Sequence, residues 1–288
     1  MTEPRTGAVQ CLSPGGLHAM RYVEWGDPHN PRVLLCVHGL TRSGRDFDRL
    51  ARVLARDWRI VCPDVAGRGR SDWLRNPAHY QISQYTADMV TLIARLDVPS
   101  VAWLGTSMGG LIGIGLAGMP DSPINRLILN DVGPHLELGG LLRIGAYVGQ
   151  PTRFASVDEA RDYIRSIAPG FALRTEAEWH ELTETSLRPS GDGFVLHYDP
   201  AIAEVLRALT PEIVQTGEQM LWHFYDSIAC PTLLLRGETS DLLSAESAAQ
   251  MCSRGPRPRM VTVPGVGHAP MFFEAAQIDI VRDFLGAS

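Results

Sequence analysis

Short, continuously apolar runs separated by amphipathic helical patterns are the feature that most restricts the fold of this 288-residue chain. The run Val33–Val37 is apolar throughout and ends in the turn signal His38-Gly39, as expected of a strand buried on both faces. A helical stripe at i, i+3, i+4 and i+7 spacing follows, and the alternation repeats. This rhythm predicts an α/β fold, a mostly parallel twisted sheet flanked by helices. Its strands are expected at residues 33–37, 59–64, 101–104, 126–131, 231–237 and 259–264.

The alternation stops after the fourth predicted strand and resumes at the fifth. Between them, residues 134–225 carry mainly helical stripes and two capping boxes, Ser156 with Glu159 and Thr175 with Glu178. A Gly/Pro-rich stretch, RPSGDGFVLHYDP, indicates a loop or short hairpin among these helices. We therefore expect a core formed by residues 1–133 and 226–288, and an inserted helical cap, or lid, at residues 134–225.

Composition excludes several classes of function. The net charge of −6 argues against a nucleic-acid partner. The sequence has no apolar stretch long enough for a membrane helix and no apolar leader at its start, so we expect a cytoplasmic protein without membrane contact. The five cysteines are odd in number and lack zinc-site spacing, which favours reduced thiols and predicts no metal or cofactor. A small-molecule substrate is the expected partner, and the sequence leaves monomer and homodimer open.

The stretch Gly105-Thr106-Ser107-Met108-Gly109 is a G-x-S-x-G motif between a predicted strand and a predicted helix. This context is the one that a nucleophile elbow requires. A sharp strand-to-helix turn strains the central residue, and its neighbours must be small to avoid collisions. The hydroxyl of Ser107 would then project at the carboxyl edge of the sheet, at a helix N-terminus that favours negative charge. We therefore predict that Ser107 is a nucleophile.

A serine hydroxyl needs a base, and the base needs a group that holds its tautomer. His268 follows the last predicted strand and is the expected base. Asp241 follows the strand at 231–237 and is the expected acid, in the chain order Ser…Asp…His. Glu238, in the same loop, and Asp131, at the end of the fourth predicted strand, are the alternatives. Asp241 is preferred because it lies furthest into its loop, with room to turn toward His268.

An oxyanion formed at Ser107 would need two backbone donors. We expect the N–H groups of Met108, which follows the nucleophile, and of Leu40, in the loop after the first core strand. Gly39 would let this backbone approach closely, and His38 is expected to orient the loop.

Together these residues resemble the α/β-hydrolase superfamily, in its branch with a serine nucleophile and a helical cap. The resemblance spans essentially the full length and rests on His38-Gly39, on PDVAGRGRSD, on the elbow, on Asp241 and on Gly267-His268. The S-M-G-G form of the elbow is similar to that of carboxylesterases, enol-lactone hydrolases, carbon–carbon bond hydrolases and cofactor-free perhydrolases. Haloalkane dehalogenases and epoxide hydrolases of this fold use an aspartate at the elbow, so the serine argues against those reactions.

The resemblance implies a hydrolase, and the predicted wall of its pocket is apolar. The expected wall residues are Leu242 and Met271, beside the predicted catalytic positions, and Trp222 or Tyr225, where the cap returns to the core. We therefore expect hydrolysis of a carboxylic ester with a hydrophobic moiety through an acyl-enzyme. Two alternatives stay open: a carbon–carbon bond or enol-lactone hydrolase of aromatic degradation intermediates, and a slow-turnover small-molecule receptor. The former would need a cation for a carboxylate, for which Arg143, Arg153 and Arg188 are candidates.

Overall fold

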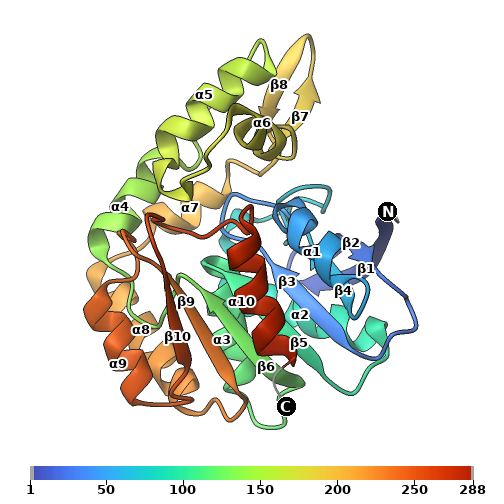
Figure 1. The fold of residues 1–288 in the computed structure, drawn as a ribbon. Helices are drawn as coiled ribbons and strands as arrows, with labels where there is room; N and C mark the ends of the chain where they lie inside the picture. Colours follow the sequence, from blue (N-terminus) through green and yellow to red (C-terminus); the bar gives the residue numbers. More distant parts are fainter. Residues whose placement is uncertain (1–2, 287–288) are drawn as a thin grey trace.

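The computed structural model describes residues 3–286 and contains an eight-stranded, mostly parallel sheet flanked by helices (Figure 1). The strand order is β1-β2-β4-β3-β5-β6-β9-β10, with β1 and β2 antiparallel to their neighbours. The predicted α/β fold is confirmed, because the six expected strands all form and lie parallel. These strands are β3 (Val33–Val37), β4 (Arg59–Pro63), β5 (Val101–Thr106), β6 (Ile124–Asn130), β9 (Thr232–Gly237) and β10 (Arg259–Val263).

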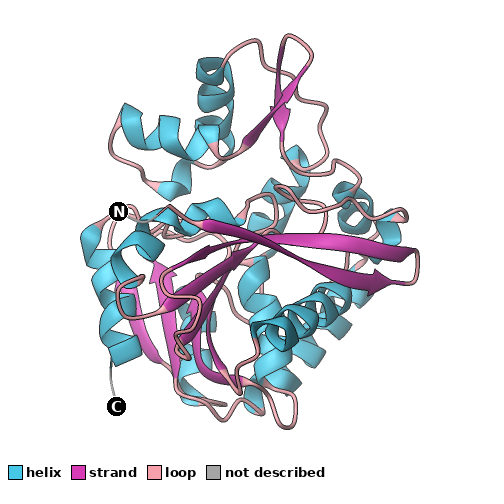
Figure 2. Cartoon of the chain, turned by 90° about the vertical axis from the view of Figure 1, so that its right-hand side faces the viewer, coloured by secondary structure: helices cyan, strands magenta, loops and turns pink. Residues whose placement is uncertain are grey.

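The antiparallel hairpin of β1 (Arg5–Ser13) and β2 (Gly16–Trp25) extends the sheet at one edge and is absent from the sequence-based prediction. It projects from the sheet as a long two-stranded ribbon (Figure 2). Its β2 strand pairs with β4 and so places the hairpin far from β5, β6 and β9 in the strand order.

Alternating side chains of the central strands bury two separate cores, one on each face of the sheet. Leu34 and Cys36 point to the face covered by α1 and α10. Leu35 and Val37, between them, pack on the opposite face with residues of the other core helices. The helices of the first face are α1 (Asp48–Leu54) and α10 (Ala275–Gly286), and those of the second are α2 (Ile82–Leu96), α3 (Met108–Ala117), α8 (Pro211–Asp226) and α9 (Ala245–Ser253).

A mainly helical insertion connects β6 to β9, and its outer part stands above the sheet as a separate lobe (Figure 1). The RPSGDGFVLHYDP stretch forms a two-stranded hairpin, and Thr175 with Glu178 forms a full capping box. The last helix of the insertion, α8, packs on α3, with the Phe224 carbonyl against Gly118. The other elements are α4 (Leu138–Tyr147), α5 (Val157–Ile167), α6 (Glu176–Glu184), β7 (Leu187–Ser190), β8 (Gly193–Leu196) and α7 (Ile202–Arg207).

Polar contacts join the lobe to the core beneath it. The amide of Gly69 donates to Nδ1 of His197 at 3.1 Å, and the amide of Asp199 donates to the carbonyl of Gly67 at 2.8 Å. Arg42 Nη1 donates to the hydroxyl of Ser186 at 2.7 Å. Within residues 3–286, none of the helices is long and apolar enough to cross a membrane.

His197 gives these contacts a pH dependence. Burial and the charge of Arg42 lower its pKa from 6.5 to about 3, so the folded protein holds this imidazole neutral. The unfolded chain takes up a proton near pH 6.5, so this contribution to stability is complete above pH 6.5 and falls as the pH drops toward 3. His197→Asn keeps an acceptor for the Gly69 amide and cannot titrate.

We expect wild type to lose about 2 kcal/mol more unfolding free energy than His197→Asn between pH 6.5 and pH 5. Urea unfolding of both proteins at three pH values in this window measures the difference. An identical pH dependence would contradict the prediction.

Candidate active site

Ser107 occupies a strained turn between β5 and α3. Its backbone is left-handed, with φ of 51°, which is rare for a residue with a side chain. The turn leaves its carbonyl free to accept from the amides of Gly110 and Leu111 and so begins the helix. Ser107 therefore sits at the N-cap of α3, as the elbow motif predicts.

Close backbone approach explains why the elbow needs glycines. A Cβ on Gly105 would lie 2.2 Å from the carbonyl oxygen of Gly109, and one on Gly109 would lie 2.0 Å from that of Val37. These contacts are with main chain, which cannot move aside without shifting β3 or α3. Gly115, later in the same helix, has space, because a Cβ there would have Thr86 Oγ1, at 4.0 Å, as its nearest neighbour.

Gly109→Ala should therefore destabilise the protein by about 3 kcal/mol or more, because the added methyl group would collide with the Val37 carbonyl of the main chain. Gly115→Ala is the matched control and should be neutral or stabilise by about 0.5–1 kcal/mol, because alanine favours the helix. The melting temperatures of the two variants and of wild type, measured by thermal unfolding, test both predicted changes in stability. Equal melting temperatures for the two variants would show that the elbow tolerates a side chain.

Ser107, His268 and Asp131 form a continuous hydrogen-bonded relay. Nε2 of His268 lies 2.9 Å from Oγ of Ser107, and Nδ1 lies 2.7 Å from Oδ2 of Asp131. The Asp131 side chain is fully buried, and its two oxygens also accept from the Gly237 amide and the Ser240 hydroxyl at 2.7 and 2.6 Å. A carboxylate held in this way can keep Nδ1 protonated, which leaves Nε2 free to accept the proton of Ser107.

The prediction that Asp241 holds the histidine is wrong. Asp241 forms a two-pronged ion pair with Arg143 of α4, at 2.5 and 2.9 Å, and this arginine holds the pKa of the carboxyl below its usual value. The Asp241 carboxylate, in the loop after β9, is therefore paired with a residue of the insertion. Asp131 can reach His268 because β6 lies between β5 and β9. The carboxyl end of β6 is therefore beside both Ser107 and the loop of Gly237.

Glu238, the other alternative, also lies outside the relay. Its carboxylate accepts from the amide of Gly265 at 2.8 Å and braces the loop that leads to His268.

The Leu40 peptide is fixed from its carbonyl side. The Gly39 carbonyl, which belongs to the same peptide unit as the Leu40 amide, accepts from His38 Nδ1 at 2.7 Å and from the Arg42 amide at 3.2 Å. His38 is fully buried, its Nε2 accepts from the Val65 amide at 2.9 Å, and burial lowers its pKa well below the usual value. A Cβ on Gly39 would lie 3.7 Å from that of Ser107, so this loop borders the serine.

The four predicted wall residues divide into two pairs. Leu242 and Met271 are buried where the insertion meets the core. Met271 packs with Ile164, Trp179 and Leu182, and the Leu242 carbonyl accepts from the Glu137 amide at 3.1 Å. Met271 follows His268 closely along the chain, and the Leu242 amide donates to Ser240, whose hydroxyl donates to Asp131, so both stay candidates for the wall.

Trp222 and Tyr225 belong to the packing of α8, which contradicts their predicted place in the wall. The Tyr225 hydroxyl donates to the Met251 carbonyl at 3.0 Å, and the Trp222 ring lies under the guanidinium of Arg254. The neighbouring Phe224 contacts Gly118, the last turn of α3, whereas Ser107 stands before its first turn. A ten-residue helix separates these ends by about 15 Å.

Main chain of the insertion lies directly against the histidine loop. The amide of Gly267 donates to the carbonyl of Gly170 at 2.8 Å. A Cβ on Gly170 would lie 3.0 Å from the amide nitrogen of His268, and one on Gly267 would lie 2.9 Å from Cα of Gly170. On the core side, a Cβ on Gly237 would lie 2.2 Å from the Gly267 carbonyl oxygen. Three glycine backbones are therefore stacked beside His268.

One cluster within residues 3–286 has the residue types of a metal site. Potential ligand atoms of Cys11, His18 and Asp88 lie within 4.8 Å of one another, all buried. His18 Nε2 lies 2.9 Å from Asp88, Gln84 donates to the same carboxylate at 2.8 Å, and burial with the Asp88 charge raises the pKa of Cys11 to about 12. The hydrogen bond between His18 of β2 and Asp88 of α2 therefore anchors the β1–β2 hairpin on this helix, with Cys11 beside it as a protonated thiol.

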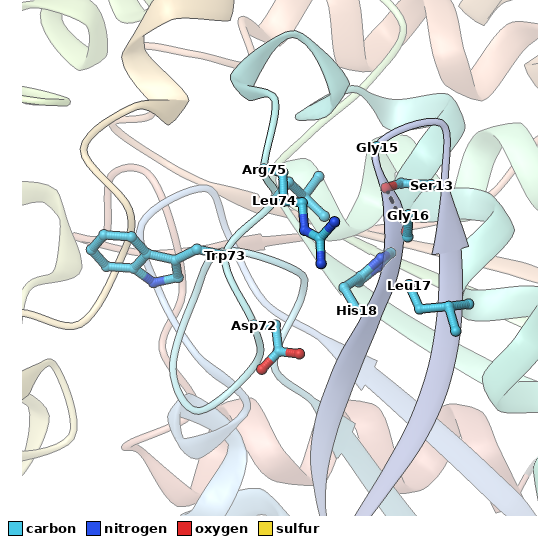
Figure 3. Close-up of a pocket in the computed structure, with 9 residues that line it drawn as sticks. All are labelled: Ser13, Gly15, Gly16, Leu17, His18, Asp72, Trp73, Leu74 and Arg75. Atoms are coloured by element: carbon cyan, nitrogen blue, oxygen red, sulfur yellow. Dashed lines mark hydrogen bonds between the residues drawn. The ribbon is translucent and has the colours of Figure 1, made fainter.

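A cavity of about 350 Å³ lies beside the turn of the β1–β2 hairpin, away from the relay (Figure 3). The loop of Asp72 to Arg75 faces the hairpin there, and the Arg75 side chain reaches into the space between them. None of the relay residues lines it, and β4 and β3 separate this edge from β5 in the sheet order.

Comparisons with known proteins identify the family of this chain. The sequence profile described as "Alpha/beta hydrolase family" matches residues 34–280. A 3-hydroxybutyrate-oligomer hydrolase from Cupriavidus necator is 53% identical over 286 residues, which cover 98% of each chain. A 2-(acetamidomethylene)succinate hydrolase from Mesorhizobium japonicum is 25% identical over 82% of this chain and 81% of its own. The crystal structure of an alpha/beta hydrolase from Novosphingobium aromaticivorans superposes with a TM-score of 0.87, at 36% identity and over 99% of each chain.

The profile covers most of the chain, and the identity to a named hydrolase extends over nearly its whole length. This protein is therefore an enzyme of the alpha/beta hydrolase family.

Proposed function

We propose that this enzyme is a serine esterase that hydrolyses short oligomers of 3-hydroxybutyrate or closely related hydroxyacid esters. The relay of Ser107, His268 and Asp131 carries the proposal, because it supplies a nucleophile, a base and a group that holds the tautomer of the base. The 53% identity to the Cupriavidus necator hydrolase supports the substrate class.

The reaction begins when Ser107 Oγ attacks an ester carbonyl and His268 Nε2 takes its proton. The tetrahedral oxyanion is stabilised by the amides of Leu40 and Met108, each of which would contribute roughly 3–4 kcal/mol. His268 then gives the proton to the departing 3-hydroxyl group of the next unit, which leaves a hydroxyacyl ester on Ser107. Water, deprotonated by His268, attacks that ester. The bond between the acyl carbon and Ser107 Oγ then breaks, Oγ takes the proton back from His268, and the acid is released.

The arginines named from the sequence give no support to a carbon–carbon bond substrate. The three arginines considered as partners for a dienoate carboxylate all have other contacts. Arg143 pairs with Asp241, Arg153 pairs with Asp192, and Arg188 lies 5.1 Å from the centre of the Trp73 ring. The carbon–carbon bond and receptor functions therefore lack a specific observation in their favour.

The test is a comparison of substrates on the purified protein. We expect rapid release of 3-hydroxybutyrate from its linear dimer and trimer, slower hydrolysis of p-nitrophenyl butyrate, and no cleavage of a vinylogous diketone acid. Mass spectrometry after rapid acid quench should show one 3-hydroxybutyryl group on the peptide that contains Ser107. Turnover of the diketone acid without turnover of the esters would refute the proposal, and so would binding of the oligomers with no hydrolysis.

A further inference from the structure

Arg68, in the GRGRS stretch after β4, is a buried cation without a carboxylate partner. Its exposed fraction is 0%, and none of the carboxylates in residues 3–286 lies within ion-pair distance of it. Asp199, which accepts from the Tyr80 hydroxyl at 2.6 Å, is outside that distance as well. Arginine is almost never fully buried unless paired, because an isolated charge is costly to remove from water. The free-energy cost of burying this charge is therefore not offset by an ion pair.

The guanidinium is instead surrounded by neutral acceptors. Nε donates to the carbonyl of Leu40 at 2.8 Å, and Nη1 donates to the carbonyl of Ala66 and the hydroxyl of Tyr85, both at 2.7 Å. Nη2 lies 3.5 Å from the sulfur of Met108, and the Tyr85 ring centre lies 4.9 Å from the guanidinium carbon. These contacts engage each nitrogen of the guanidinium and leave its charge unneutralised.

One side chain therefore contacts both residues whose amides would form the oxyanion hole. Leu40 lies in the loop after β3, Met108 is the first residue of α3, and Arg68 lies in the loop after β4. On the opposite side of the Leu40 amide, His38 fixes the Gly39 carbonyl. With Arg68 on the Leu40 carbonyl, the backbone of this residue is held on both sides.

We propose that Arg68 is a positioning residue of the oxyanion hole, which holds Leu40 and Met108 in register and places an uncompensated positive charge behind the developing oxyanion. The proposal rests on the proposed function, because it assumes attack by Ser107. Fixed charges in a water-excluded site act strongly on charge that develops in the transition state. After burial, the charge of Arg68 is among the causes that lower the pKa of both His38 and His197, so its field reaches groups around the site.

Three variants separate charge from geometry. Arg68→Met removes the charge and keeps a long side chain, and Arg68→Lys keeps the charge but loses the planar fork. Arg59→Met is the control for the loss of a mostly buried arginine, because Arg59 pairs with Glu24 near β2 and lies outside the site. For each protein we would measure kcat and KM on the 3-hydroxybutyrate dimer and the inhibition constant of butylboronic acid. This probe forms an anionic tetrahedral adduct on a serine nucleophile and so resembles the oxyanion.

We expect Arg68→Met to lower kcat at least 30-fold and to weaken boronate inhibition by a similar factor, while KM changes less than threefold. Arg68→Lys should lose three- to tenfold in both quantities, and Arg59→Met should lose less than twofold in either. A folded Arg68→Met variant with kcat and boronate affinity within twofold of wild type would overturn the proposal. If Arg68→Met does not fold, Arg68→Lys decides, and unchanged kcat and boronate affinity would then overturn it.

Wild type and Ser107→Ala, assayed alongside, keep the two proposals separate. An inactive wild type, or an active Ser107→Ala, refutes the proposed function. An active wild type whose activity needs Ser107, combined with Arg68 variants that bind boronate normally, refutes the role of Arg68 alone.

Discussion

Ser107→Ala is expected to lower kcat for ester hydrolysis by about 10⁴-fold or more, the largest effect of any single substitution in this enzyme. In the proposed mechanism the variant loses the atom that would form the acyl-enzyme, so its residual rate would reflect water attack assisted by the proposed oxyanion hole. The fold should remain, because alanine and serine both carry a Cβ and strain the turn at φ of 51° equally. Steady-state assays on the 3-hydroxybutyrate dimer, beside thermal unfolding of both proteins, measure the two effects separately.

An unchanged melting temperature with the expected loss of rate would assign the loss to chemistry. Hydrolysis by the variant at more than a hundredth of the wild-type rate would mean that another group makes the bond to the acyl carbon.

Asp131→Asn is expected to lower kcat by about 10³- to 10⁴-fold. An asparagine cannot stabilise the imidazolium, and its amide hydrogens would face Nδ1 of His268 and favour the wrong tautomer. The substitution also disturbs the bonds from the Gly237 amide and the Ser240 hydroxyl, so some loss of stability should accompany it. Assays below the melting temperature of the variant give the catalytic part.

Asp241→Asn is the matched control for that experiment and should lose less than tenfold. It changes the same chemical group on the neighbouring loop but removes an ion pair with Arg143 in which both side chains are a third or more exposed. Such pairs contribute little, roughly 0–1 kcal/mol. If Asp241→Asn were the more damaged of the two variants, the acid assigned from the geometry would be incorrect.

The choice between these aspartates marks the limit of what the sequence could predict about the site. Motif context is enough to identify Ser107 and His268 as partners, because each follows a strand whose end lies at the same edge of the sheet. The identity of the third residue follows from the strand order, and Asp241 is paired instead with Arg143, which is 98 positions away and within the insertion. Periodicity gives no information on which carboxylate a distant helix will neutralise.

The fold shows the same division between local and distant information. The central parallel strands are buried and mostly apolar, so they are visible as near-continuous apolar runs, whereas the largely exposed edge strand β10 is visible by its β-branched residues. The β1–β2 hairpin is missing from the prediction although its sequence alternates around the turn Ser-Pro-Gly-Gly, which is itself a hairpin signal. Helix α8 lies in the stretch predicted to be mainly helical. Its docking on α3, however, needs a glycine at position 118, because a Cβ there would lie 2.2 Å from the Phe224 carbonyl oxygen.

The stacked glycines beside His268 connect the outer lobe directly to the loop that holds this histidine. The bond from the Gly267 amide to the Gly170 carbonyl is a main-chain link between the outer lobe and the histidine loop. Any movement that lifts this part of the lobe to admit an ester must first break that link and so release one support of the imidazole. The position of this part of the lobe and the position of His268 are therefore coupled through main chain rather than through side chains.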